Sequence, residues 1–110
     1  MRVLLDEGVP DIIQKHLKHL SIATVQELGW RGIRNGDLLD LMAGRFQLLI
    51  TTDKNLPFQQ NLFKRQISVI GLPSNRIRIL KRLMSRIALA IDTIRPGELV
   101  RIPEEDEIGP

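Results

Sequence analysis

The sequence predicts an α/β fold, a three-layer sandwich around a mostly parallel sheet of about five strands. Short runs of Val, Leu and Ile recur between turn residues, and such runs are typical of strands buried on both faces. Segments with apolar residues at helical spacing alternate with these runs. The chain has 110 residues, which is enough for one domain with one core.

The first part of the chain alternates strand and helix. Residues 2–6 form the first expected strand, and Pro10 is well placed in the first turn of a helix whose apolar positions continue to Leu20. A short second strand is expected over residues 22–25. A loop with three glycines, residues 29–36, then leads to the next helix.

The middle of the chain repeats this alternation. Asn35 or Gly36 is expected to cap a helix that ends at Gly44. The third strand is expected over residues 46–51, and a short helix over residues 58–65.

The last part of the chain predicts a strand, the longest helix and a final strand. The fourth strand is expected over residues 67–71, and the long helix opens at Pro73 and Ser74. Its apolar positions, in steps of three and four, are Ile77, Leu80, Met84, Ile87, Ile91 and Ile94. Pro96 and Gly97 end the helix, and residues 99–102 form an edge strand.

The charge of the chain is unevenly distributed. We expect one domain over residues 1–102 and an acidic tail over residues 103–110, in which Glu104 to Glu107 are four consecutive acids. The net charge is +3 for the whole chain, but sixteen Lys and Arg against nine acids leave +7 for residues 1–102. A basic body suits an anionic partner such as RNA, although many small domains are basic without binding one.

The composition of the chain indicates the cellular compartment in which we expect the protein to lie. Cysteine is absent, so disulfides and thiolate metal sites are excluded, which fits a cytoplasmic protein. No apolar stretch approaches the ~20 residues that span a bilayer, so we expect no membrane association. The N-terminus leads directly into strand-like sequence, which predicts no signal peptide.

Two aspartates follow the most apolar strands, and they are the main candidates for chemistry. Asp6 ends the first strand and Asp53 follows the third. If these strands are neighbours, both carboxylates open into one crevice at the carboxyl ends of the strands. Such a pair calls for a cation, and oxygen ligands favour Mg²⁺ or Mn²⁺. The alternative is structural, because Asp often ends a strand and begins a turn.

Other acids and hydroxyls lie close to these positions. Glu7 offers a further oxygen ligand, or it stabilises the first turn of a helix. Asp37 is a third acidic candidate, but an Asp near a helix start is favourable without any catalytic role. Thr51 and Thr52 can hydrogen-bond a carboxylate, or simply favour the strand.

The predicted long helix carries a basic ridge. Arg78, Arg82 and Arg86 recur in steps of four, with Arg76 and Lys81 beside them, and such a ridge could follow a phosphate backbone. The alternative is a solvated helix face. Aromatic residues are scarce, and Trp30 either contacts a base or packs its loop onto the domain.

Three segments resemble small bacterial PIN-like proteins. They are residues 4–10, LLDEGVP against "LLDENLP"; residues 27–39, ELGWRG and DLL against "LGLRG…DEEI"; and residues 49–56, LITTDKNL against "LVTNDRDF". The resemblance covers roughly residues 1–75. It implies a PIN-like domain and a metal-dependent ribonuclease, often the toxin of a toxin–antitoxin pair, with RNA and an antitoxin protein as partners.

The resemblance also implies the site residues. Asp6, Asp37 and Asp53 match the family's acidic positions, and Glu7 matches the adjacent acid. Asn55 stands where many relatives have a second Asp, which would weaken divalent affinity.

Two other functions are compatible with the sequence. A response-regulator receiver domain also has acids after strand one and a phosphorylated Asp after strand three, but it needs a Lys after the last strand, where this chain has Arg101. A PIN-like binding module without catalysis is the other, and the missing acid at Asn55 favours it. Apolar residues in the segment 56–63 would serve either a homodimer or the core.

Overall fold

The structure, a computed structural model, describes residues 1–55 and 61–104, and its sheet is parallel throughout. The strands are β1 (Arg2–Leu5), β2 (Ser21–Thr24), β3 (Leu48–Thr51), β4 (Ser68–Gly71) and β5 (Leu99–Arg101), and the helices are α1 (Ile12–His16), α2 (Asn35–Met42), α3 (Leu62–Arg65), α4 (Ile77–Arg82) and α5 (Met84–Thr93). The predicted α/β sandwich with a parallel five-stranded sheet is therefore confirmed.

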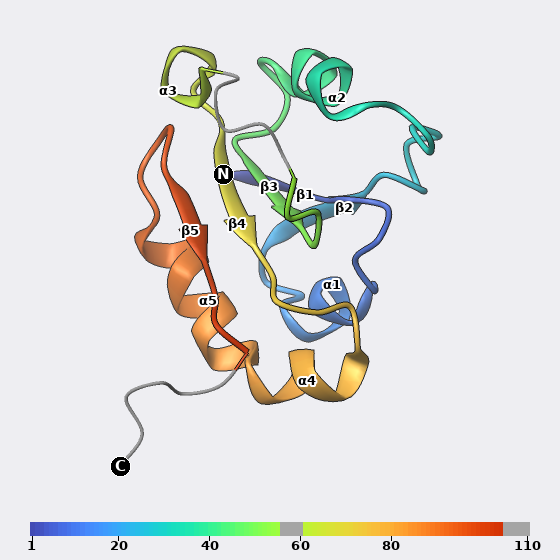
Figure 1. Cartoon of the computed structure of the whole chain (residues 1–110), viewed down its shortest axis with the longest axis vertical. Coiled ribbons are helices and arrows are strands. Elements are labelled where there is room, and N and C mark those ends of the chain that lie inside the picture. Colours follow the sequence, from blue (N-terminus) through green and yellow to red (C-terminus); the bar gives the residue numbers. More distant parts are fainter. Residues whose placement is uncertain (56–60, 105–110) are drawn as a thin grey trace.

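Helices cover both faces of the sheet (Figure 1). Helices α1, α4 and α5 lie on one face, and α2 and α3 lie on the other. Leu5, Ile50 and Ile70, which are register partners on adjacent strands, pack into the first layer, whereas Leu4 and Leu49 pack into the second. All five are fully buried, and each contributes about 1.5–3 kcal/mol through burial. The sheet is thus buried on both faces, as its uninterrupted apolar runs predict.

The strand order brings the first and third strands together. The order is β2-β1-β3-β4-β5, with Val3 opposite Leu48 and Leu5 opposite Ile50. The chain leaves β1 toward one side of the sheet and leaves β3 toward the other. The carboxyl ends of β1 and β3 therefore form the switch point, where open parallel sheets bind their ligands.

The connection from β4 to β5 has the opposite hand to the other crossovers. The β1–β2 connection runs toward one edge of the sheet with α1 on one face, and the β4–β5 connection runs toward the other edge with α4 and α5 on that same face. The β2–β3 and β3–β4 connections pass over the opposite face and share the hand of the first. The connection through α4 and α5 therefore differs in hand from the other three, although crossovers in parallel sheets nearly always share one hand.

The predicted long helix is interrupted, and this is a correction. Leu83 separates α4 from α5, with φ −95° and ψ 2°, and its N–H is shared between the carbonyls of Ile79 (3.2 Å) and Leu80 (3.1 Å). Such a tight turn bends a helix without breaking its apolar face. The ten residues of α5 form the longest described helix, and no helix in the described ranges is long and apolar enough to cross a membrane.

Several element boundaries also differ from the predictions. Helix α1 ends at His16 because Leu17 leaves helical geometry, with φ −108° and ψ 54°. Strand β3 begins at Leu48, since the Phe46 N–H still bonds the Met42 carbonyl of α2. Of the helix expected over residues 58–65, Leu62–Arg65 is present, and residues 56–60 lie outside the described ranges.

Candidate functional site

One hydroxyl group joins the two predicted aspartates. Thr51 Oγ1 donates to Asp6 Oδ2 at 2.7 Å and accepts from the Asp53 N–H at 3.0 Å. The Thr51 side chain is only 1% exposed, so water competes little for these bonds. The structure therefore places Asp6 and Asp53 together at the carboxyl edge of the sheet, at the switch point.

Both carboxylates are held by further donors. The Glu7 N–H donates to Asp6 Oδ1 at 2.8 Å. At Asp53, Oδ1 accepts from the Asn55 N–H and Oδ2 accepts from Asn35 Nδ2, each at 2.8 Å. Every carboxylate oxygen of the pair thus has one donor and keeps acceptor capacity for another partner.

This donor set fits a divalent cation of the Mg²⁺ type. Such an ion is usually held by one or two carboxylates, with waters and substrate oxygens as its other ligands. Over residues 1–55 and 61–104, no group of three or more His, Cys, Asp or Glu side chains is arranged to hold a metal ion. The two aspartates that the Thr51 hydroxyl connects are the candidate ligands, and a metal site remains a prediction.

Glu7, a further predicted ligand, points toward the glycine loop. Its Oε1 accepts from the Gly32 N–H at 2.7 Å, and its carbonyl accepts from Gln26 Nε2 at 2.8 Å. The Glu7 side chain is exposed. In this arrangement Glu7 fastens the loop before α2 to the end of β1.

Asp37 lies in the first turn of α2, where its side chain is exposed. It lines a shallow depression together with Asp40. The connection between α2 and the aspartate pair is made by Asn35, through its bond to Asp53. The sequence suggested Asn35 only as a helix cap, and nothing in its spacing could reveal a partner eighteen positions away.

A cavity of about 510 Å³ lies between the segment after β1, helix α1 and the turn after β2. Its polar lining comes from Glu7, Asp11, Gln14, Thr24, Gln26, Glu27 and Asn75. No Lys or Arg is among its described lining residues. The cavity therefore presents carboxylates and amides, and it suits a positive group better than a bare anion.

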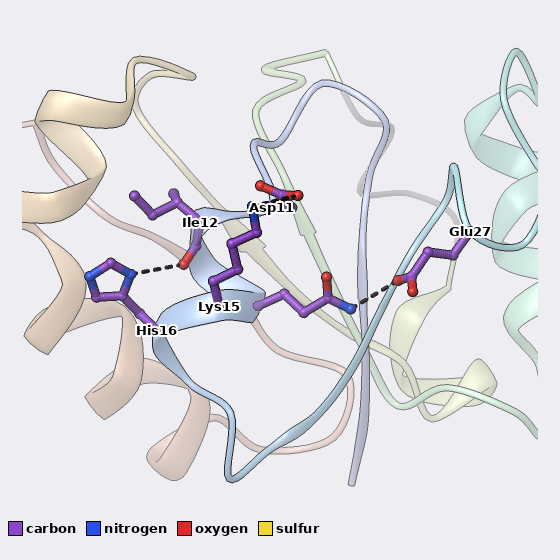
Figure 2. Close-up of polar contacts among 6 residues, drawn as sticks. Asp11, Ile12, Lys15, His16 and Glu27 are labelled. Atoms are coloured by element: carbon purple, nitrogen blue, oxygen red, sulfur yellow. Dashed lines mark hydrogen bonds and ion pairs between the residues drawn. The ribbon is translucent and has the colours of Figure 1, made fainter.

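Glu27 anchors one wall of this cavity. The Thr24 N–H donates to Glu27 Oε1 at 2.9 Å, and the Glu27 N–H donates to Thr24 Oγ1 at 3.0 Å. This reciprocal pair is a capping box, so the Thr-x-x-Glu spacing was the sequence signal for it. Gln14 Nε2 also donates to Glu27 Oε1, at 2.9 Å (Figure 2). The Gln14 bond, followed by the Thr24 bonds, holds the pKa of Glu27 below its ordinary value.

The exposed face of α1 carries two contacts within the helix (Figure 2). Lys15 Nζ lies 3.5 Å from Asp11 Oδ2, one helical turn away. His16 Nδ1 lies 3.1 Å from the Ile12 carbonyl oxygen of its own helix. His16 is thus a surface histidine bound to its own backbone.

Four cations form what we call the α4 basic surface, namely Arg76, Arg78, Lys81 and Arg82. All four side chains are exposed, and none has a carboxylate partner in the part of the chain that the structure describes. Arg86, the third member of the predicted ridge, lies half-buried on α5 beyond the bend. The bend therefore divides the predicted ridge of Arg78, Arg82 and Arg86 between two helices.

Trp30 packs its loop onto the domain. Its ring meets Phe46 edge-on with centroids 6.2 Å apart, and the Arg45 guanidinium lies 5.0 Å from the Trp30 ring centroid. The ring also packs against the core cluster beneath α2. Of the two interpretations of Trp30, the structure supports packing.

In comparisons with protein-family models, curated proteins and solved structures, none matches this chain. The resemblance to PIN-like proteins therefore stays a prediction, and the site must be judged on its own geometry.

Proposed function

We propose that the protein is a Mg²⁺- or Mn²⁺-dependent endoribonuclease of PIN-like type that acts in the cytoplasm. The observation that carries this proposal is the pair of Asp6 and Asp53, joined through Thr51 at the switch point of the sheet. Two carboxylates held at one edge fit a divalent ion, and divalent ions serve many phosphodiesterases. We also propose that the protein is the toxin of a toxin–antitoxin pair and that an antitoxin protein binds it.

In this proposal each residue near the pair has a defined task. Asp6 and Asp53 hold the ion, which when bound supplies positive charge to phosphate oxygens and activates a water. Thr51 holds the Asp6 carboxylate through a hydrogen bond, and Asn35 orients the Asp53 carboxylate. Positioning donors of this kind matter because metal ligands that can rotate bind more weakly.

The RNA strand would be held by cations on α4 and α5, which are separate elements from those that carry the aspartate pair. Arg78 and Arg82 lie one turn apart on α4, a spacing that lets both reach one phosphate backbone. Arg86 would extend the contact onto α5. Such contacts position the strand without reading its sequence.

Cleavage of a labelled RNA tests the proposal directly. With Mg²⁺ or Mn²⁺, we expect the wild type to cleave, and Asp6→Asn and Asp53→Asn to lose about 100-fold or more in rate. Asp11→Asn is the matched control, because Asp11 is an acid of the cavity beside α1 and should leave the rate unchanged. Equal rates for wild type and Asp6→Asn, or no cleavage by the wild type, would contradict the catalytic proposal. Metal-independent RNA binding without cleavage would instead favour the PIN-like binding module.

A receiver-like phosphoacceptor is the second candidate, and one observation favours it. The strand order β2-β1-β3-β4-β5 is that of flavodoxin-like folds, which include receivers. Two observations weigh against it: the β4–β5 connection differs in hand from the other three, and β5 ends in Arg101 where a receiver has Lys. Incubation with acetyl phosphate, read by mass spectrometry, would label Asp53 only in a receiver.

A further inference from the structure

The acidic tail leaves the domain next to the α4 basic surface. The Ile102 N–H donates to the Gly71 carbonyl at 2.9 Å, so the chain beyond β5 ends level with the carboxyl end of β4. Arg76, the first cation of the surface, follows Gly71 by only five residues. Ile102 is buried in the core cluster that also contains Leu80 of α4. The starting point of the tail and the start of α4 are therefore fixed at the same edge.

The α4 basic surface and the acidic tail carry opposite charges, four on each. Four exposed cations crowd into the short stretch from Arg76 to Arg82, and they lack carboxylate partners within the described ranges. Like charges one turn apart, such as Arg78 and Arg82, destabilise a helix by a few tenths of a kcal/mol. Residues 104–107 are four consecutive acids. An anionic segment placed against α4 would relieve this repulsion.

We propose that the acidic tail, residues 104–107, docks on the α4 basic surface of the same chain. Four extended residues span about 13 Å, and the six-residue helix α4 is about 9 Å long, so the tail can cover its cations. The tether gives the tail an effective concentration on the order of millimolar, so a weak contact is sufficient.

The docked tail is an intramolecular competitor. A phosphate backbone would need the same four cations, so the tail and a nucleic-acid strand exclude each other. This consequence for RNA rests on the proposed function, whereas the contact between tail and α4 does not. The contact is electrostatic and surface-exposed, so salt weakens it.

The lack of cysteine makes the contact measurable in the full chain. Ile108→Cys gives a single site for a nitroxide label, whose paramagnetic broadening of backbone amides is read by NMR. The matched control carries the same label with Glu104→Gln, Glu105→Gln, Asp106→Asn and Glu107→Gln, so the tether is identical and only the charge differs. We expect selective broadening of the α4 amides in the acidic tail, lost in the neutral tail and at about 1 M salt, where the screening length is about 3 Å. Equal broadening in both tails would overturn the proposal.

Binding of a fluorescent single-stranded RNA tests the competition. At low salt we expect the neutral tail to tighten binding about tenfold. The same neutral tail is then placed on a chain that also carries Arg76→Gln, Arg78→Gln, Lys81→Gln and Arg82→Gln, where we expect no gain in RNA affinity. Comparing the two gains distinguishes release of the α4 basic surface from a general effect of the net charge of the chain. An equal gain in both backgrounds would contradict docking. If no variant binds RNA, the proposed function fails, and the amide broadening still decides whether the tail docks.

Discussion

The aspartate pair and the α4 basic surface are built in opposite ways. At the aspartate pair, each carboxylate oxygen has a donor, and the linking Thr51 hydroxyl is buried. At the α4 basic surface, the cations are exposed and have no carboxylate partner among the described residues. The first region depends on particular atoms in fixed positions, and the second depends on the amount of positive charge. Isosteric and charge-preserving substitutions should therefore affect the two regions differently.

Thr51→Val should have the largest effect on stability. Valine has the shape of threonine but leaves Asp6 Oδ2 and the Asp53 N–H without their partner, so we expect unfolding free energy to fall by about 2 kcal/mol. Chemical denaturation measures this loss. Thr93→Val is the control, because the Thr93 hydroxyl bonds only its own helix at the surface and its loss should cost under about 0.5 kcal/mol. Equal losses for both variants would mean that the aspartate pair is not specially constrained.

Asn35→Asp should make stability depend on metal. The change removes the donor to Asp53 Oδ2 and adds a second negative charge beside it, so we expect a loss of about 1–2 kcal/mol without divalent ions. Mg²⁺ should restore more of the melting temperature in this variant than in the wild type. Asn75→Asp, the same exchange at an exposed residue that lines the cavity, is the control. If Mg²⁺ does not change the melting temperature of Asn35→Asp, the proposal of a metal site at this edge is contradicted.

Substitutions on the α4 basic surface should alter salt dependence and leave stability unchanged. With Arg78→Gln and Arg82→Gln together, we expect the slope of log affinity for single-stranded RNA against log salt to fall by about 1.4. Unfolding free energy should change by less than about 0.5 kcal/mol. Arg78→Lys with Arg82→Lys keeps the charge and should keep the slope. A large loss on the lysine exchange would show that this surface, too, relies on specific geometry.

Glu27→Gln should have the smallest effect, and only a pH titration reveals it. Because the pKa of Glu27 is lowered in the folded state, chiefly by the Gln14 bond, its contribution to stability is present above the unfolded pKa and is lost as pH falls through the folded value. We expect the wild type to be slightly more stable than Glu27→Gln at pH 7, and this advantage to shrink as pH falls through the folded pKa of Glu27. If the difference in unfolding free energy between the two proteins does not change with pH, it does not arise from the ionisation of Glu27.

Much of the fold was predictable because each central strand of the sheet contains a short run of consecutive apolar residues. The strands β1 and β3 each contain three consecutive apolar residues, and an Asp comes within three residues after each run, so the position of Asp6 and Asp53 at one edge was predictable. The bend at Leu83 was not, because the apolar period runs through it unchanged. The hand of the last crossover was also beyond prediction, since local sequence does not determine which face α4 and α5 cover.

The finer parts of the site depend on tertiary contacts. The bond from Asn35 to Asp53 joins residues eighteen positions apart, across a loop whose path no local pattern determines. The cavity beside α1 likewise needs the turn after β2 and the loop before α4 to come together. Glu27 was the exception, because its spacing from Thr24 is a recognisable capping pattern.

The most direct test of the account is a crystal grown with Mn²⁺ and measured at the manganese absorption edge. An anomalous peak should lie about 2 Å from a carboxylate oxygen of both Asp6 and Asp53. A peak that touches neither aspartate, or none at these residues under saturating Mn²⁺, would contradict the claim that this edge of the sheet holds a divalent cation.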